Sequence, residues 1–311
     1  MELVINPPQE VFDQLIHLAG ATNGWAHQPY DYRFYSQAYD GYWFVAMVDT
    51  EKEPQEKFVA GGCLARWDTV NDAPLYSIGL YYCREEYRGK GHGIPVFQKM
   101  MDIVSDGNCV LTAAADMSPK YAKTFGFTEM LAYWQMEANI EPKKMKIPEN
   151  LVTEYTTKDW REVNAEQLEA YDLTICPRAR RKIIRPWFEQ DQSYTRVAFE
   201  RNQNIVGYCT IRVINLNRLC TAPFYAENVH VAEQLLAGIR GMGIIPNFQN
   251  FEKIIFWYPE VNKDVERLLQ KFAPDGGFSV HVDFRTQFTK TIIEARDEVV
   301  YAVSCSVHQF V

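Results

Sequence analysis

Three glycines alternate with other residues in the stretch Arg88-Gly89-Lys90-Gly91-His92-Gly93, which lies between two segments of different periodicity. Residues 74–83 (PLYSIGLYYC) are rich in aromatic side chains and carry no charge, which is typical of a strand. Residues 95–104 (PVFQKMMDIV) have apolar side chains at the spacing of an amphipathic helix. A glycine turn between a strand and a helix favours a backbone anion site, because the first N–H groups of a helix lack partners and its dipole attracts negative charge.

The spacing of these glycines excludes the two most common nucleotide loops. A dinucleotide fingerprint GxGxxG that starts at Gly89 needs glycine where the chain has Ile94. A Walker loop needs GxxxxGK followed by Ser or Thr, and the sequence has no such stretch. The remaining pattern is RxxGxG, with Pro95 in the first helical turn, where a missing N–H costs little.

The chain divides into two halves with the same order of predicted elements. Each half reads as helices, a hairpin, two strand–helix pairs and a closing strand. The segment 141–150 (EPKKMKIPEN) between them is polar and contains prolines, so it is the predicted linker between a domain over 1–140 and a domain over 151–311. A length of 311 residues is too great for one ordinary core and sufficient for two.

Composition limits the class of function. The net charge of −8 and the pI of about 5.4 argue against nonspecific nucleic-acid binding, which needs a basic surface. No apolar run reaches 18 residues and the N-terminus does not resemble a signal peptide, so we expect no membrane partner and a cytoplasmic location. The seven cysteines form no CxxC pair and the histidines are isolated, so we expect neither a metal site nor a disulfide framework.

One basic segment, PRARRKIIRPWF over residues 177–188, departs from the acidic average. It can form a solvated helix face with an apolar stripe through Ile183, Ile184 and Trp187. The alternative is a site for an anionic substrate group.

The RxxGxG pattern between a strand and a helix resembles the acyl-CoA pyrophosphate loop of the GNAT N-acetyltransferases. The longer stretch IGLYYCREEYRGKGHGIPVF is similar to the YitH-like subgroup, in which a second, degenerate GNAT domain follows the first. The stretch FGF, residues 125–127, resembles the GF that ends the next motif. The resemblance is specific over about residues 40–135, and in the second half it rests on element order and on APFYAENVHVAEQLL.

This resemblance implies an α/β (α+β) fold with tandem GNAT-like domains. Each domain has a mixed, mostly antiparallel central sheet flanked by helices, and the first has a splayed strand pair. The resemblance also implies acetyl-CoA (coenzyme A) as the donor. Its pyrophosphate lies on the main chain of Arg88, Gly89, Lys90, Gly91, His92, Gly93 and Ile94, and its pantetheine arm lies along Leu80, Tyr81, Tyr82 and Cys83.

The implied reaction is direct attack of an amine on the thioester in a ternary complex. Many GNAT enzymes use as their acid a tyrosine four residues before the glycine of GF, and here that position is Ala122. Tyr121 is the candidate acid, although one residue turns a helix by about 100°. The alternative is a packed tyrosine. Asp116 is the candidate base, and the alternative is that it caps the following helix.

The family builds the acceptor site from its early helices, which here include the stretch GWAHQPYDYRFYSQAYDGYW. Tyr30, Asp31 and Tyr35 are the candidate substrate-binding residues, because aromatic and acidic side chains suit a cationic amine. The alternative is an aromatic packing layer over the sheet.

We therefore expect an acetyl-CoA-dependent N-acyltransferase that acts on the amine of a small molecule. The alternative is a non-catalytic acyl-CoA-binding or regulatory protein with a GNAT fold. In the second half, TAPFYAENVHVA stands where the loop would fall and contains no glycine, so we expect no pyrophosphate site there.

Overall fold

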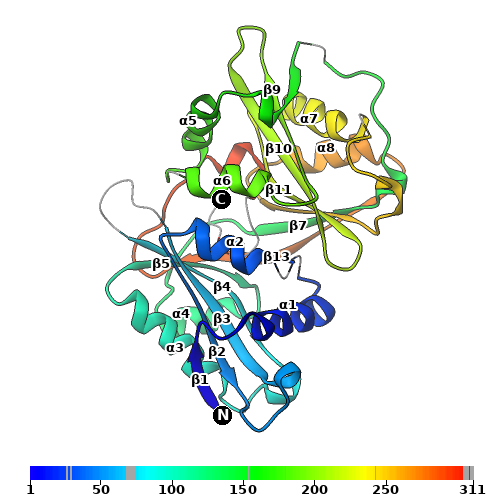
Figure 1. Cartoon of the computed structure of the whole chain (residues 1–311). Helices are drawn as coiled ribbons and strands as arrows, with labels where there is room; N and C mark the ends of the chain where they lie inside the picture. The colour runs from blue at the N-terminus through cyan, green and yellow to red at the C-terminus, as the bar shows by residue number, and fades with distance from the viewer. Residues whose placement is uncertain are drawn as a thin grey trace. The chain divides into compact units, whose positions relative to one another are not determined.

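The computed structural model describes residues 1–25, 27–28, 30–67, 74–152, 154–178, 180–241, 243–303 and 308 (Figure 1). The chain forms two compact units. Unit 1 contains Met1–Met130 and Thr286–Ile292, and unit 2 contains Leu131–Arg285 and Ile293–Val311. These units differ from the predicted domains 1–140 and 151–311, because each unit takes a short segment from the other half of the sequence.

Unit 1 is a twisted sheet with helices on both faces. Its strands are β1 (Glu2–Ile5), β2 (Gly41–Val48), β3 (Phe58–Trp67), β4 (Leu75–Cys83), β5 (Asn108–Ala114), β6 (Glu129–Met130) and the last residues of β13 (Phe278–Phe288). Its helices are α1 (Gln9–Asn23), α2 (Asp31–Ala38), α3 (Gly93–Val104) and α4 (Ser118–Phe125). Strands β1 to β4 pair antiparallel, whereas β4 and β5 pair parallel.

Successive side chains along each strand of unit 1 point to opposite faces of the sheet, so each face has its own packing layer. Val45 of β2 faces the layer beneath α3, in which Val96, Phe97 and Met100 of the helix are buried. Phe44 faces the opposite layer, where its ring meets Phe12 of α1 edge to face. Both faces of the sheet are covered, so its central strands read as continuous apolar runs.

Unit 2 has the same order of elements. Its strands are β7 (Gln135–Ile140), β8 (Thr156–Asp159), β9 (Ser193–Phe199), β10 (Ile205–Ile214), β11 (Arg218–Ala226), β12 (Ile254–Pro259), most of β13, and β14 (Val300–Ala302). Its helices are α5 (Ala165–Ile175), α6 (Arg181–Phe188), α7 (Val229–Gly241) and α8 (Asp264–Phe272). The pairing is antiparallel from β8 to β11, and β11 pairs parallel with β12.

The predicted α/β class with two similar mixed sheets is confirmed by this architecture. In each unit a helix connects the two strands of a parallel pair, α3 between β4 and β5 and α7 between β11 and β12, as a parallel connection requires. Strand β7 lies between β12 and β13 in unit 2, pairing antiparallel with both. The C-terminal end of β13 pairs with β6 in unit 1.

The basic segment 177–188 has two environments. Arg181 and Lys182 are exposed, while Ile184 and Trp187 are buried, as expected for an amphipathic helix. Arg180 is buried instead, and its guanidinium binds both carboxylate oxygens of Asp172, at 2.5 and 3.0 Å. Tyr208 and Tyr225 also bind this pair through their hydroxyls.

Removing one member of this buried pair should destabilise unit 2. The substitution Asp172→Ala leaves the Arg180 charge buried without its carboxylate, which costs about 3–5 kcal/mol. The matched control is Asp275→Ala, because Asp275 also pairs with a cation, Lys146, but is exposed. Urea denaturation should show a large loss of stability for the first variant alone, and equal effects of the two would contradict a structural role for the buried pair.

Candidate functional site

A β-bulge interrupts β4 near its C-terminal end. Gly61 of β3 lies opposite Tyr82 and Cys63 lies opposite Gly79, so Leu80 and Tyr81 together face the single residue Gly62. Leu80 adopts φ of 53°, a left-handed conformation that is uncommon for a residue with a side chain. Such a bulge bends the strand and disturbs its ladder of hydrogen bonds.

Strands β4 and β5 separate at the same level. Their parallel register ends at the pair Ile78 and Leu111, although β4 continues to Cys83 and β5 to Ala114. In the described part of the chain, residues 79–83 therefore have no strand partner on this side. Backbone groups at such an edge can bind an extended ligand arm by the same hydrogen bonds that a strand would make.

The glycine loop continues directly from this open edge into α3. Gly89 and Gly91 have φ of 73° and 83°, which favours glycine at both positions. The helix begins at Gly93, and no side chain caps its first turn. Among the described residues, the N–H groups of Gly89, Gly91, His92 and Gly93 have no acceptor. This cluster of donors at a helix N-terminus can hold an anionic group.

The corresponding helix of unit 2, α7, is capped by the chain itself. The Asn228 side-chain oxygen accepts hydrogen bonds from the N–H groups of His230 and Val231, at 3.0 and 3.1 Å. These are the donors that an anion would otherwise use. The corresponding helices of the two units therefore begin differently. The first N–H groups of α7 are bound by Asn228, whereas those of α3 are left open by the glycine loop.

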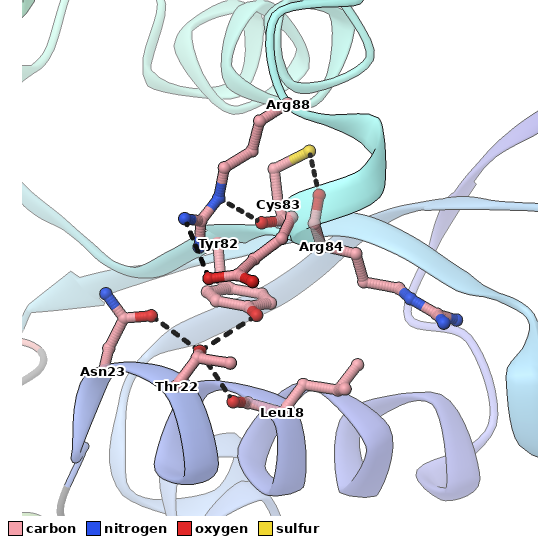
Figure 2. A network of polar contacts seen from close by, with 8 residues as sticks. Leu18, Thr22, Asn23, Tyr82, Cys83, Arg84 and Arg88 are labelled. Carbon is pink, nitrogen blue, oxygen red and sulfur yellow. Dashed lines mark hydrogen bonds and ion pairs between the residues drawn. The ribbon is translucent and has the colours of Figure 1, made fainter.

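Side chains from β4, the loop and α1 form a polar network beside the bulge (Figure 2). Arg88 Nε donates to the carbonyl oxygen of Cys83 at 3.0 Å, and its guanidinium lies 5.4 Å from the centre of the Tyr82 ring. The Tyr82 hydroxyl lies 3.0 Å from Thr22 Oγ1 of α1. The sequence did not indicate Thr22, because a lone threonine near the end of a helix carries no distinctive signal.

Tyr81 reaches the start of α3 from the other face of β4. A Cβ atom at Gly93 would lie only 2.3 Å from the Tyr81 hydroxyl oxygen, so this glycine allows the side chain to lie there. The ring packs edge-on against Phe97 at 5.2 Å. Burial raises the pKa of Tyr81 to about 12, so its hydroxyl stays protonated at neutral pH and remains a hydrogen-bond donor.

Tyr121 lies in the same packing layer. Its ring stacks on Phe97 with centroids 5.3 Å apart and meets Tyr81 edge-on at 6.4 Å. Burial, with smaller contributions from Tyr81 and Asp116, raises the pKa of Tyr121 above its ordinary value. The hydroxyl is therefore protonated, which a general acid requires, while Ala122 contributes no acidic group.

Asp116 lies at the surface, in the turn between β5 and α4. Helix α4 begins at Ser118, and its N-cap residue Met117 provides no side-chain hydrogen bond. Asp116 is thus not the cap of this helix, which was the alternative to its role as a base. Its role as a base stays a prediction.

The three predicted acceptor residues differ in how much of their surface is exposed. Tyr35 is 1% exposed and stacks on Tyr42, with ring centroids 5.7 Å apart. Asp31 is fully buried and accepts a hydrogen bond from the N–H of Gln28 at 3.0 Å. Tyr30 is 38% exposed. Of the three, Tyr30 alone presents a large surface to a ligand.

A hollow of about 420 Å³ lies elsewhere, in unit 2, between the end of α7 and the loop 243–250. The Arg240 guanidinium stacks on Phe248 beside it, 4.9 Å from the ring centre. None of the predicted site residues borders it. No group of three metal-binding side chains and no helix able to cross a membrane occurs in the part of the chain that the structure describes.

Two family models match the sequence. Residues 1–175 match the family described as "Protein of unknown function (DUF1248)", and residues 168–275 match the "Acetyltransferase (GNAT) domain". No curated protein matches the chain.

Solved structures with the same fold cover nearly the whole chain. A putative acetyltransferase from Pyrococcus horikoshii has a TM-score of 0.69 at 15% identity, covering 99% of this chain and 96% of that chain. A tandem GNAT protein from the clavulanic acid biosynthesis pathway has a TM-score of 0.64 at 12% identity, with coverage of 92% and 98%. A GCN5-related N-acetyltransferase from Sphaerobacter thermophilus has a TM-score of 0.57 at 11% identity, with coverage of 92% and 95%. The similarity confirms the predicted tandem GNAT fold.

A negative charge placed in the glycine loop should weaken anion binding without unfolding unit 1. We expect Gly91→Asp to weaken acetyl-CoA binding about tenfold or more, which corresponds to ~1.4 kcal/mol, by isothermal titration calorimetry. Gly276→Asp is the matched control, because Gly276 also has a positive φ (77°) and open space around it but lies in unit 2. The backbone strain is then similar in both variants. Unchanged affinity in Gly91→Asp would show that the loop does not hold the diphosphate.

Proposed function

Because the chain belongs to the family described as "Protein of unknown function (DUF1248)" and to the GNAT superfamily with tandem domains, we propose that it is an acetyl-CoA-dependent N-acyltransferase. The acceptor is the amine of a small molecule, which attacks the thioester directly in a ternary complex. The observation that carries this proposal is the uncapped start of α3, where the glycine loop leaves its N–H groups open beside the unpaired edge of β4.

Each part of this site has a distinct task in the proposed reaction. The main chain of residues 88–94 binds the pyrophosphate, and the edge of β4 at residues 79–83 binds the pantetheine arm. The amine loses a proton to a base, for which Asp116 is the candidate, and its nitrogen forms a bond to the thioester carbon. The carbon–sulfur bond then breaks, and the departing sulfur takes a proton from the Tyr121 hydroxyl.

The cysteines have no part in this reaction. Burial raises the pKa of Cys63 to about 12 and also raises the pKa of Cys83, so both thiols are protonated and are poor nucleophiles. Direct transfer needs no acyl-enzyme, so this inertness is consistent with the proposal. Within the described residues the cysteines form no disulfide, which suits a reducing compartment such as the cytoplasm.

The second candidate function is binding of acyl-CoA without transfer. It is favoured by one observation, which is that Ala122 occupies the helix position of the usual acid while Tyr121 is only 8% exposed. A net charge of −8 makes nucleic acid an unsuitable partner for either function.

Turnover separates the two candidates. Purified protein is mixed with acetyl-CoA and a panel of small amines, and free thiol is followed with a chromogenic disulfide. We expect thiol release with at least one amine. Tight acetyl-CoA binding without release across the panel would favour the binding protein, and absence of binding in folded protein would contradict both functions.

The role of Tyr121 is tested in the same assay. Removing the acid in Tyr121→Phe should lower kcat about a hundredfold and change the Kd for acetyl-CoA little. The control Tyr76→Phe also removes a tyrosine hydroxyl from unit 1, but in the part of β4 that is paired with β5. It should leave kcat unchanged. Because burial raises the pKa of Tyr121, wild-type activity should persist to pH values above the ordinary value near 10 for tyrosine before this acid is lost. Equal kcat values in wild type and Tyr121→Phe would remove Tyr121 from the mechanism.

A further inference from the structure

Residues 286–292 complete unit 1, although they follow most of unit 2 in the sequence. They lie beside β5, the strand that separates from β4 at the candidate site. The N–H of Thr289 donates to the carbonyl oxygen of Cys109 at 2.9 Å, and the N–H of Cys109 donates to Thr289 Oγ1 at 2.9 Å. The Asn108 side chain donates to the carbonyl oxygen of Thr291 at 2.7 Å. This segment is therefore an integral part of the sheet of unit 1.

Gln287 in this segment forms hydrogen bonds at both ends of α4. Its side chain is fully buried, and its amide nitrogen lies 3.3 Å from the carbonyl oxygen of Ser118 and 3.0 Å from that of Phe127. Ser118 is the first residue of α4, and Phe127 follows the Gly126 that ends it. One amide group thus binds both ends of the helix. Both partners are acceptors, so the amide nitrogen, which has two hydrogens, must face them.

The connection continues to Tyr121 through the main chain. The carbonyl oxygen of Tyr121 accepts hydrogen bonds from the N–H groups of Gly126 and Phe127, which form the turn after α4. The carbonyl oxygen of Phe127 in turn accepts from Gln287. Gln287 therefore holds the turn that closes on Tyr121, and it also holds the first turn of the helix that carries Tyr121.

We propose that Gln287 is a positioning residue for acyl transfer in unit 1, and that it acts by fixing α4 and the orientation of Tyr121. This inference rests on the proposed function. Gln287 is far from Tyr121 in the sequence and lies in a segment that follows β12 and α8. The C-terminal half of the chain thus supplies a residue that the site of the N-terminal half needs.

A substitution of similar shape isolates the two hydrogen bonds. Gln287→Met keeps an unbranched side chain of similar length and removes both donors, which leaves the carbonyl oxygens of Ser118 and Phe127 without this partner. We expect kcat for thiol release to fall about tenfold to a hundredfold, because a small displacement of a catalytic group has a large effect on rate. The Kd for acetyl-CoA should change less than about threefold, since the glycine loop is untouched.

The control is Lys290→Ala in the same segment. Lys290 is exposed, and its side chain binds the carbonyl oxygen of Asp106 at the surface. It should leave both kcat and Kd unchanged. A loss of kcat in the control equal to that in Gln287→Met would overturn the proposal, because the segment would then act by general stability.

A second variant, Gln287→Glu, adds a pH-dependent readout. A neutral carboxyl can donate one hydrogen to the carbonyl oxygens, whereas a carboxylate can donate none and repels them. Burial favours the neutral form, so activity in this variant should be highest at low pH and should fall as the pH rises through the raised pKa of the new group. Wild type should show no such decline over the same range. A parallel pH profile in the two proteins would overturn the proposal.

A spectroscopic measurement decides the positioning role separately from turnover. With 3-fluorotyrosine incorporated at position 121, the ¹⁹F resonance reports the environment of this ring. We expect it to shift or broaden in Gln287→Met and to stay unchanged in Lys290→Ala. An unchanged resonance in Gln287→Met would refute the link between the two residues. Failure of the wild type to release thiol would refute the proposed function alone, since the ¹⁹F comparison does not depend on turnover.

Discussion

The need of every backbone polar group for a partner governs both the fold and the candidate site. Within each sheet, backbone N–H and C=O groups of neighbouring strands bind one another, and within each helix they bind those of the next turn. Unit 1 departs from this at the candidate site, where the bulge at Leu80 and the separation of β4 from β5 leave an unpaired edge beside the open donors of α3. A ligand with matching acceptors and donors can make the hydrogen bonds that a neighbouring strand makes elsewhere in the sheet.

Unit 2 has the same architecture as unit 1, but its helix α7 has no such open start. Unit 2 keeps the strand–helix–strand arrangement around α7, but Asn228 takes the position before the helix and uses its side chain to satisfy the first N–H groups. A glycine provides no such side chain and allows the main chain to approach an anion closely. The difference between an open and a closed helix start therefore depends on very few residues, while the sheets around them remain alike.

The elements that form the loop side of the candidate site could be predicted from the sequence, because each depends on residues that are neighbours in the chain. The glycine loop, the uncharged strand before it and the amphipathic helix after it depend on neighbouring residues, and all three lie where they were expected. Helix α1 continues through Gly20, which is buried within it, and ends at Asn23, where Gly24 provides the left-handed end. Local pattern does not distinguish a glycine that packs inside a helix from one that ends it.

The parts that could not be predicted depend on residues far apart in the chain. No local signal indicates that β7 pairs in unit 2, or that Gln287 binds the ends of α4. The aromatic stretch before β2 could be read as a binding surface or as a packing layer, and composition alone cannot separate these. The structure buries Tyr35 against Tyr42 of the following strand, and it buries Asp31, which accepts a hydrogen bond from the N–H of Gln28.

The exchange of segments between the halves has a consequence for synthesis of the protein. The strand that borders β5 follows residues 131–285, so the edge of β5 has no permanent partner while all of these residues are being made. An unpaired strand edge is a template for pairing with other chains. Unit 1 comes first in the sequence, but it is complete only when residues 286–292 have been made, after most of unit 2.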